Sequence, residues 1–204
     1  KPCAGRKLQS FLPRYFSAGN VPQTVQEFLK MDCLEAINHR CSTREFEPTA
    51  ELDPTILEKL LHAGIAAPSA GNCQPWHFFV VTSPEVKRAL AEAAYNQTFL
   101  CDAAVVLAVC AVPTRSARRY GRRGETLYCI QDTAAAIENI LLAATALDLA
   151  TCWIGAFDDV RVAQALHLPE DLRPVALIPV GKPLRRPQRQ TTRRPLHDVV
   201  TWLS

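Results

Sequence analysis

Glycine is scarce in this 204-residue chain, and the positions of its eight glycines exclude several functions. They stand at 5, 19, 64, 71, 121, 124, 155 and 181, so neither GxGxxG nor GxxxxGK can be written. GxSxG and HExxH are absent as well. The sequence therefore lacks a dinucleotide-binding fingerprint, a P-loop and the usual motifs of serine hydrolases and zinc proteases.

Long apolar runs are also missing. The longest, at 103–112, has ten residues, whereas a helix that spans a bilayer needs about 18 or more. We interpret this run as a core strand and expect no membrane association. The net charge of +3, from 23 basic and 20 acidic residues, is too small to indicate nucleic-acid binding by itself. With 48% hydrophobic and 21% charged residues, the composition is typical of a globular protein.

Cysteine is not scarce, but its spacing is uninformative. No two of the eight cysteines are separated by two residues, so the sequence contains no zinc-binding pair, thioredoxin motif or iron–sulfur run. Several lie in apolar stretches, where a free cysteine packs like a small hydrophobic residue. We therefore predict reduced core cysteines in a cytoplasmic protein. The five histidines are scattered over separate segments, and we assign no metal.

Residues 1–30 differ from the rest of the chain. They hold five basic residues and one acid, Glu27, and three prolines interrupt any long helix. This segment could be a targeting stretch, sequence upstream of a natural start at Met31, or an arm that packs on a neighbouring subunit. We favour the last two, because no apolar segment or clear amphipathic face is present. The predicted domains are thus an arm or extension at 1–30 and one domain at 31–204.

Hydrophobic periodicity predicts a single α+β domain, and we expect its sheet to be mixed and flanked by helices. We expect helices at 32–39, from 54 to near Pro68, from 84 onward, 125–149 and 159–168, and strands at 77–82, 103–112, 151–157 and 175–180. The basic, glycine-punctuated segment 114–124 is predicted to be a loop. The helix at 125–149 is apolar almost all round, which indicates that it lies in a subunit interface.

Three segments contain residues that could form a ligand-binding site. In RCSTREF, residues 40–46, two arginines and a hydroxyl could hold a phosphate, although basic residues also favour a helix end. In the segment 67–81, Asn72 and Gln74 could read the edge of a planar heterocycle, or could satisfy their own turn. In the segment 131–157, Gly155 permits the close approach of a ligand, or simply a tight strand end.

Together these three segments, RCSTREF, PSAGNCQPWHF and QDTAAAIENILLAA…WIGAF, resemble the nitroreductase family of FMN-dependent oxidoreductases, from about Met31 to the end of the chain. The resemblance implies a homodimer with long helices at its interface and one FMN in each of two shared pockets. Where the family usually has Gly-Leu-Gly, this chain has Asp148-Leu149-Ala150, and we expect that change to stiffen the end of the helix.

The resemblance also implies a role for each matching residue. Arg40, Ser42 and Arg44 would hold the phosphate side or a flavin carbonyl, and Pro68, Ser69 and Ala70 would contact the flavin of the partner subunit. Asn72 and Gln74 match the loop that meets the isoalloxazine and ribityl chain, and Ile154, Gly155 and Ala156 match a strand end near the reactive nitrogen. The last phosphate-binding segment would be Gly181, Lys182 and Arg193, with Arg194 as the alternative to Arg193.

The implied activity is electron transfer from NADH or NADPH through FMN to a nitroaromatic, quinone or similar electron-poor acceptor, by a ping-pong mechanism. No side-chain general base is required, and Arg44 or Lys182 could stabilise the anionic reduced flavin. One alternative is a flavin-storing or sensing protein without turnover. Another is a nucleic-acid-binding protein that uses the arginine-rich segments 114–124 and 182–194, although both have few aromatic residues. We expect no nucleic-acid partner.

Overall fold

The computed structural model of the chain describes residues 31–48, 50–185 and 191–203; the predicted arm at 1–30 lies outside this range. Among the described residues, no helix has both the length and the apolarity needed to cross a membrane. The helices and strands, in chain order, are α2 (Cys33–His39), α3 (Pro54–Ile65), β1 (Trp76–Val81), α4 (Pro84–Ala93), β2 (Val105–Ala111), α5 (Pro113–Arg123), α6 (Cys129–Ala146), β3 (Ala150–Thr151), α7 (Asp159–Ala165) and β4 (Arg173–Gly181).

The four strands form an antiparallel sheet in the order β1-β2-β4-β3. At one end of β2, Ala111 pairs with Trp76, and at the other end Val105 pairs with Val180. The predicted α+β class is confirmed, but the four strands pair only in the antiparallel sense, so the prediction of a mixed sheet is wrong. Of the pairings that involve described residues, the only parallel one is an isolated bridge between Ser42 and Thr151.

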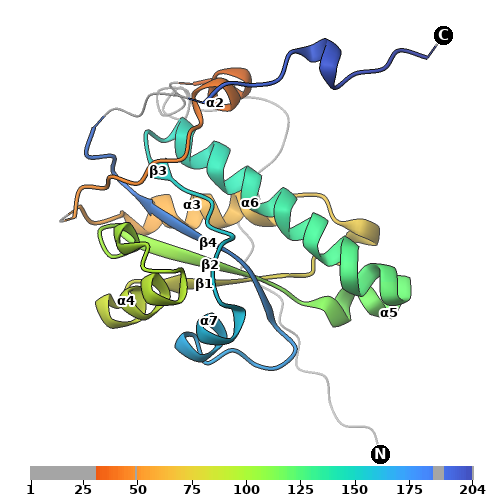
Figure 1. Ribbon diagram of the computed structural model, residues 1–204, viewed down its shortest axis with the longest axis horizontal. Helices are drawn as coiled ribbons and strands as arrows, with labels where there is room; N and C mark the ends of the chain where they lie inside the picture. The colour runs from red at the N-terminus through yellow and green to blue at the C-terminus, as the bar shows by residue number, and fades with distance from the viewer. Residues whose placement is uncertain (1–30, 49, 186–190, 204) are drawn as a thin grey trace, which may run out of the picture.

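Helices cover both faces of the sheet (Figure 1). One core cluster joins α4 and α7 to the face of β2 that presents Val106 and Ala108. The other joins α3 and α6 to the opposite face, which presents Leu107 and Val109. Because alternate residues of β2 point to opposite faces and every one is buried, the strand is apolar throughout. This explains the long apolar run in the sequence.

Two of the predicted helix starts are built by side-chain caps. The Asp53 carboxylate accepts a hydrogen bond from the Thr55 amide at 2.8 Å, and Pro54 occupies the first helical position of α3. Asp32 and Glu35 form a reciprocal capping box at the start of α2, with bonds of 2.9 and 3.0 Å. These local signals place both helices next to segments that carry the predicted site.

Three element predictions are corrected. Residues 114–123, predicted to be a loop, lie in α5, because Pro113 starts the helix and its alanine and arginines favour it, although Gly121 interrupts it with a φ of 54°. The strand predicted at 151–157 is restricted to Ala150–Thr151, and beyond it Ile154 alone bridges to Leu177. The long helix begins as a π turn at Gly124–Tyr128 and ends at Ala146 rather than Leu149.

The end of α6 keeps a glycine-like backbone without the glycine. Asp148 has a φ of 56°, and the amides of Asp148 and Leu149 donate to the carbonyls of Thr145 and Ala144 at 3.1 and 2.9 Å. This is the Schellman arrangement, in which the left-handed position is usually glycine.

We expect Asp148→Gly to raise the free energy of unfolding by about 1 kcal/mol, since it removes the steric cost of a Cβ at that backbone conformation. Asp148→Ala is the matched control and should give no gain, because it keeps the Cβ. Urea denaturation of the three proteins measures the difference, and an equal stability of the glycine and alanine variants would contradict the explanation.

Candidate functional site

Backbone hydrogen bonds bring two of the predicted phosphate-binding segments together. The Thr43 amide donates to the Thr151 carbonyl at 2.8 Å, which fixes the RCSTREF segment beside β3. The Glu47 amide donates to the Lys182 carbonyl at 3.0 Å, and the Leu184 amide donates to the Glu45 carbonyl at 3.1 Å. The structure therefore places the segment of Arg40, Ser42 and Arg44 alongside Gly181 and Lys182.

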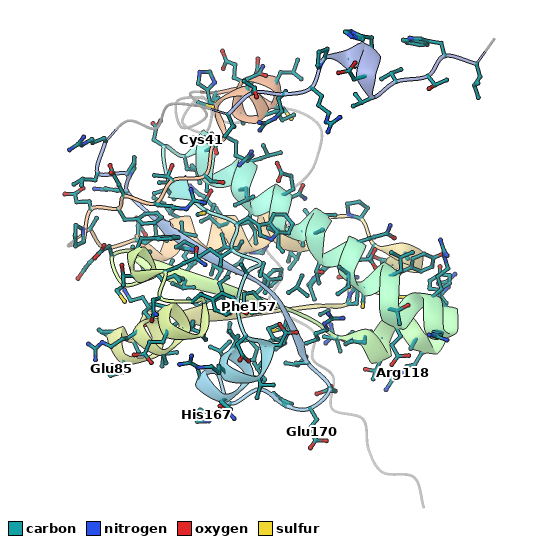
Figure 2. All side chains as sticks on the ribbon, viewed as in Figure 1. Cys41, Glu85, Arg118, Phe157, His167 and Glu170 are labelled. Carbon is teal, nitrogen blue, oxygen red and sulfur yellow. The ribbon has the colours of Figure 1, made fainter. Side chains whose placement is uncertain are left out.

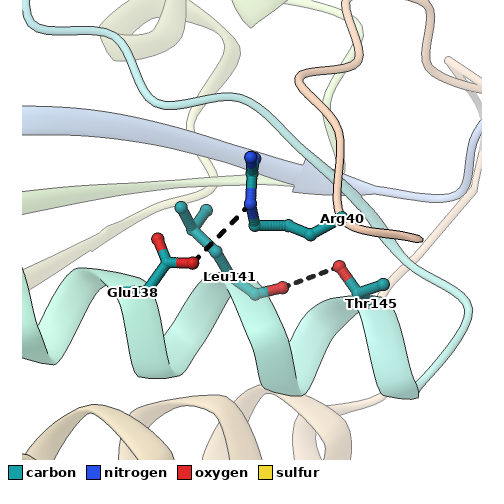
Figure 3. Close-up of polar contacts among 4 residues, drawn as sticks. All are labelled: Arg40, Glu138, Leu141 and Thr145. Carbon is teal, nitrogen blue, oxygen red and sulfur yellow. Dashed lines mark hydrogen bonds and ion pairs between the residues drawn. The ribbon is translucent and has the colours of Figure 1, made fainter. Parts of the chain in front are cut away.

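The two arginines of this group are held by different partners. Arg40 Nε lies 3.6 Å from Glu138 Oε1 of α6 (Figure 3). The Arg44 guanidinium lies 5.9 Å from the centre of the Phe99 ring, which in turn stacks on Phe46. Arg40, Arg44 and Lys182, which we call the basic group, thus lie on segments that meet at one end of the sheet, where their side chains could bind an anion.

Cys152 follows β3 directly and is buried beside this basic group. Burial raises the pKa of its thiol, and the positive charge of Arg44 and a hydrogen bond with Ser42 only partly oppose that effect. A thiol with a raised pKa is a poor nucleophile. Cys152 is therefore a packing residue here, and Cys110 and Cys129 are also buried, as predicted for core cysteines. The prediction is wrong for Cys33 and Cys101, which are exposed.

Gly155 faces open space. A Cβ placed on it would meet only the Trp153 indole nitrogen, at 4.0 Å. On one side, the Ile154 amide donates to the Leu177 carbonyl at 3.0 Å; on the other, Gln97 Nε2 donates to the Ala156 carbonyl at 3.3 Å. The segment is thus fixed at both ends, with room beside the Gly155 backbone for a planar ligand. The sequence alone does not predict a role for Gln97, because no motif includes it.

The loop before β1 adopts an unusual backbone. Gly71, Asn72 and Gln74 have φ values of 55°, 56° and 48°. Gln74 Nε2 donates to Asn72 Oδ1 at 3.2 Å, so the two amide groups are aligned with each other. Among the described residues, no hydrogen bond occupies the Asn72 NH₂ group or the Gln74 side-chain oxygen, Oε1, and together these two groups could bind both acceptors and donors of a heterocycle. Asn72 and Gln74 therefore stay candidates for binding a heterocycle.

Side chains of α5 and α6, which were not singled out as site residues, contact this loop. Arg115 Nη1 donates to the Gln74 carbonyl at 2.9 Å, and Arg119 Nη1 donates to the Gly71 carbonyl at 3.0 Å. The Ala70 amide donates to Asp132 Oδ1 at 3.1 Å. The available signal was the i,i+4 spacing of the arginines after Pro113, which places both on one helix face.

Asp132 is an incompletely paired buried acid. Its exposed fraction is 7%, and its second oxygen, Oδ2, is buried without a hydrogen-bond partner among the described residues. Desolvation by burial raises the pKa of its carboxyl group, and the bond from the Ala70 amide only partly offsets this. The ionised carboxylate therefore costs stability, because the folded state disfavours the charge.

We expect this cost to appear in the pH dependence of stability. Since the pKa is raised in the folded state, the cost is present at neutral pH and is relieved as the pH falls through the folded-state pKa. Asp132→Asn removes the charge and keeps an oxygen for Ala70. As the pH is lowered from 7 toward 4, Asp132 is protonated in the wild type, so the free energy of unfolding of the variant minus that of the wild type should decrease. Urea denaturation of both proteins across this range measures the difference; a difference that does not change with pH would contradict it.

The predicted site residues fall into groups at opposite ends of the sheet. Gln74 precedes Trp76, which pairs with Ala111, whereas Gly181 follows Val180, which pairs with Val105 at the other end of β2. The seven residues of β2 span about 20 Å. Within one protomer, the loop at 68–74 and the basic group are therefore far apart, and Gly155 lies between them along the sheet, next to the Ile154–Leu177 bridge.

Arg193 stands apart from both groups in its contacts. It is exposed, and its guanidinium donates to Thr191 Oγ1 and to the Thr192 carbonyl, both at 3.0 Å. The described C-terminal segment that carries it runs away from the body of the protomer (Figure 1). Sequence proximity to Lys182 thus does not bring Arg193 into the basic group through any described hydrogen bond.

Known proteins share this sequence pattern and fold. The family model described as the nitroreductase family matches residues 37–98 and 93–182. A protein of Archaeoglobus fulgidus named "Putative NADH dehydrogenase/NAD(P)H nitroreductase" is 36% identical over 156 residues, which cover 74% of this chain and 86% of that protein.

Solved structures of other proteins share this fold. A nitroreductase family protein from Clostridium novyi NT is 34% identical, with a TM-score of 0.67 over 75% of this chain and 86% of its own. The NADPH:FMN oxidoreductase of Vibrio harveyi, solved in complex with NAD⁺, is 27% identical, with a TM-score of 0.76 over 84% of this chain and 77% of its own.

Proposed function

The chain belongs to the nitroreductase family and is an NAD(P)H-dependent flavin oxidoreductase; we propose that its FMN binds beside Gly155, with its phosphate at the basic group. The observation that carries this proposal is the free space at Gly155, which a single methyl group would begin to fill. When bound, FMN supplies the chemistry, accepting hydride from NADH or NADPH and reducing a nitroaromatic, quinone or similar acceptor.

The residues of the chain fit an FMN molecule in charge and in shape. Arg40, Arg44 and Lys182 offer charged donors to a phosphate, and Ser42 adds a hydroxyl. The backbone at Gly155 can approach a planar ring closely because no side chain intervenes. A positive charge from Arg44 or Lys182 would also stabilise negative charge on the reduced ring. The protein thus holds and tunes the cofactor without a side-chain base.

We further propose that the functional unit is a homodimer. Because the loop at 68–74 and the basic group lie at opposite ends of the sheet, we expect the loop of a second copy to contact a flavin whose phosphate is held by the basic group. Partly exposed apolar residues on α6, such as Ile130, Ala134 and Leu142, support this proposal. So do the exposed apolar side chains Leu34, Leu196, Val199, Trp202 and Leu203, whose exposed fractions run from 62% to 94%.

The cytoplasm is the proposed location. Every cysteine of the described ranges is a free thiol, as expected where thiols are kept reduced. The nucleic-acid alternative is disfavoured by the contacts of α5, where Arg115 and Arg119 bond to the loop at 68–74 and Arg123 bonds to the Tyr128 hydroxyl. Those three arginines are engaged within the protein.

The test is a visible absorption spectrum of the purified protein, followed by heat release and chromatography of the chromophore. FMN in a ratio of about one per chain would support the proposed site. A colourless protein that fails to take up added FMN would refute it. Turnover of NADH or NADPH with a nitroaromatic or quinone then separates the enzyme from a flavin-storing or sensing protein, which would bind FMN without turnover.

A further inference from the structure

The loop at 69–74 holds a backbone conformation that its own residues do not favour. Gly71, Asn72 and Gln74 are all in the left-handed region, with Cys73 between them at a φ of −71°. Glycine adopts this region freely and asparagine tolerates it, whereas a residue such as glutamine does so at a steric cost. A conformation of this kind persists only where surrounding contacts impose it.

Four side chains impose it by hydrogen bonds to the loop backbone. Ser69 Oγ accepts from the Gln74 amide at 2.9 Å, and Asp132 Oδ1 accepts from the Ala70 amide at 3.1 Å. Arg115 and Arg119 donate to the carbonyls of Gln74 and Gly71. Two of these bonds come from guanidinium groups and one goes to a buried carboxyl, and bonds to charged groups are stronger than those between neutral groups.

Side chains of α5 also pack closely around Gly71. A Cβ at this position would lie 2.5 Å from the Tyr120 hydroxyl and 2.9 Å from Arg119 Cδ. The Arg119 guanidinium also lies 5.6 Å from the centre of the Tyr120 ring. Arg119 and Tyr120 of helix α5 therefore pack against the loop, and Arg119 also forms a hydrogen bond with it. Arg118, on the outer side of the same helix, has no described partner (Figure 2).

We propose that Arg115 and Arg119, together with Asp132, are positioning residues for flavin binding, which clamp the loop so that Asn72 and Gln74 face the flavin. This inference rests on the proposed function, because it takes FMN as the ligand of the loop. In the proposed dimer, the clamp of one copy would act on the flavin bound by the other. The arginines contact the loop and not the reacting atoms.

The clamp is tested in two measurements on the full chain. In apo protein, hydrogen–deuterium exchange reports the Ala70 and Gln74 amides directly, whether or not flavin binds. In a fluorescence titration with FMN, Arg115→Ala and Arg119→Ala should each raise the dissociation constant by roughly tenfold, the loss expected for one charge-assisted hydrogen bond. Exchange at the two amides should become faster in the same variants, while thermal denaturation stays close to that of the wild type.

Arg118→Ala is the matched control, since it removes the same charge from the same helix without removing a loop contact. It should leave exchange unchanged and the dissociation constant within about twofold of the wild type. An equal weakening by Arg118→Ala, or wild-type exchange and affinity in both clamp variants, would overturn the inference. If an alanine variant fails to fold, Arg119→Lys replaces it, and should restore part of the affinity because lysine keeps a cationic donor.

The outcomes separate the inference from the proposed function. A wild-type protein that binds no FMN refutes the proposed function, and the flavin role of the clamp falls with it. A wild-type protein that binds FMN, with clamp variants that bind it equally well, refutes only the inference. Slower exchange in the wild type than in the clamp variants without any change in FMN affinity would show a structural contact with no role in flavin binding.

Discussion

Gly124→Ala is expected to lower the free energy of unfolding by about 3 kcal/mol. A Cβ at Gly124 would lie 2.4 Å from the Ser116 carbonyl oxygen, 2.6 Å from its carbon and 2.9 Å from Tyr120 Cβ. Two of these atoms are backbone of α5, and Ser116 is fully buried. The added methyl group cannot be accommodated by a side-chain rotation, so α5 must move away from the start of α6.

Urea denaturation measures this loss, and Gly155→Ala is the control. At Gly155 the same methyl group meets only the Trp153 indole nitrogen at 4.0 Å, so stability should stay within about 0.5 kcal/mol of the wild type. The control also has a readout of its own, because it should weaken FMN binding. A stable Gly124→Ala protein would show that the junction between the two helices yields more easily than close packing implies.

Arg44→Ala is expected to raise the dissociation constant of FMN by roughly 10- to 100-fold, the loss that follows from removing a charged donor to a phosphate. Arg44 suits this test better than Arg40. Removing Arg40 would leave Glu138 without its partner, whereas the neighbour of Arg44 is the Phe99 ring. The effect on FMN can therefore be measured without leaving a carboxylate unpaired.

A fluorescence titration gives the dissociation constants, and Arg161→Ala is the matched control. Arg161 lies on α7 at the surface, where its guanidinium is 3.7 Å from Glu92, and a surface ion pair of this kind contributes little to stability. Its removal should leave FMN binding unchanged. An Arg44→Ala protein that binds FMN as tightly as the wild type, with a normal melting temperature, would remove Arg44 from the phosphate site.

The sequence indicated the helices and the central strands well because their signals are local. Asp53 and Pro54 start α3, and the apolar alternation of β2 places it in the middle of the sheet. The prediction of a loop at 114–124 was wrong because residues in this segment favour different structures. Glycines at 121 and 124 suggested a loop, yet Gly124 is required by close packing against Ser116, and the arginines around them favour a helix.

Among the candidate site residues, the sequence identified which residue types could bind a flavin but not how they meet. Lys182 follows the last residue of RCSTREF, Phe46, by 136 residues, and the hydrogen bonds of Glu47 and Leu184 hold the two segments side by side. Asp132 lies in the QDTAAAIENILLAA stretch and Arg115 follows Pro113, but neither position indicated that these side chains bond to the backbone of a distant loop. Such contacts have no sequence signature, because any helix that packs there could supply them.

The amino-acid sequence by itself determined the family, the α+β class and the residues with the chemistry for FMN, since these follow from residue type and short-range spacing. The tertiary structure alone decided that the basic group and the loop at 68–74 lie at opposite ends of the sheet. It also decided that α5 clamps that loop. Both follow from the register of β1 and β4 on β2, which sets where each loop emerges over a distance that no local pattern encodes.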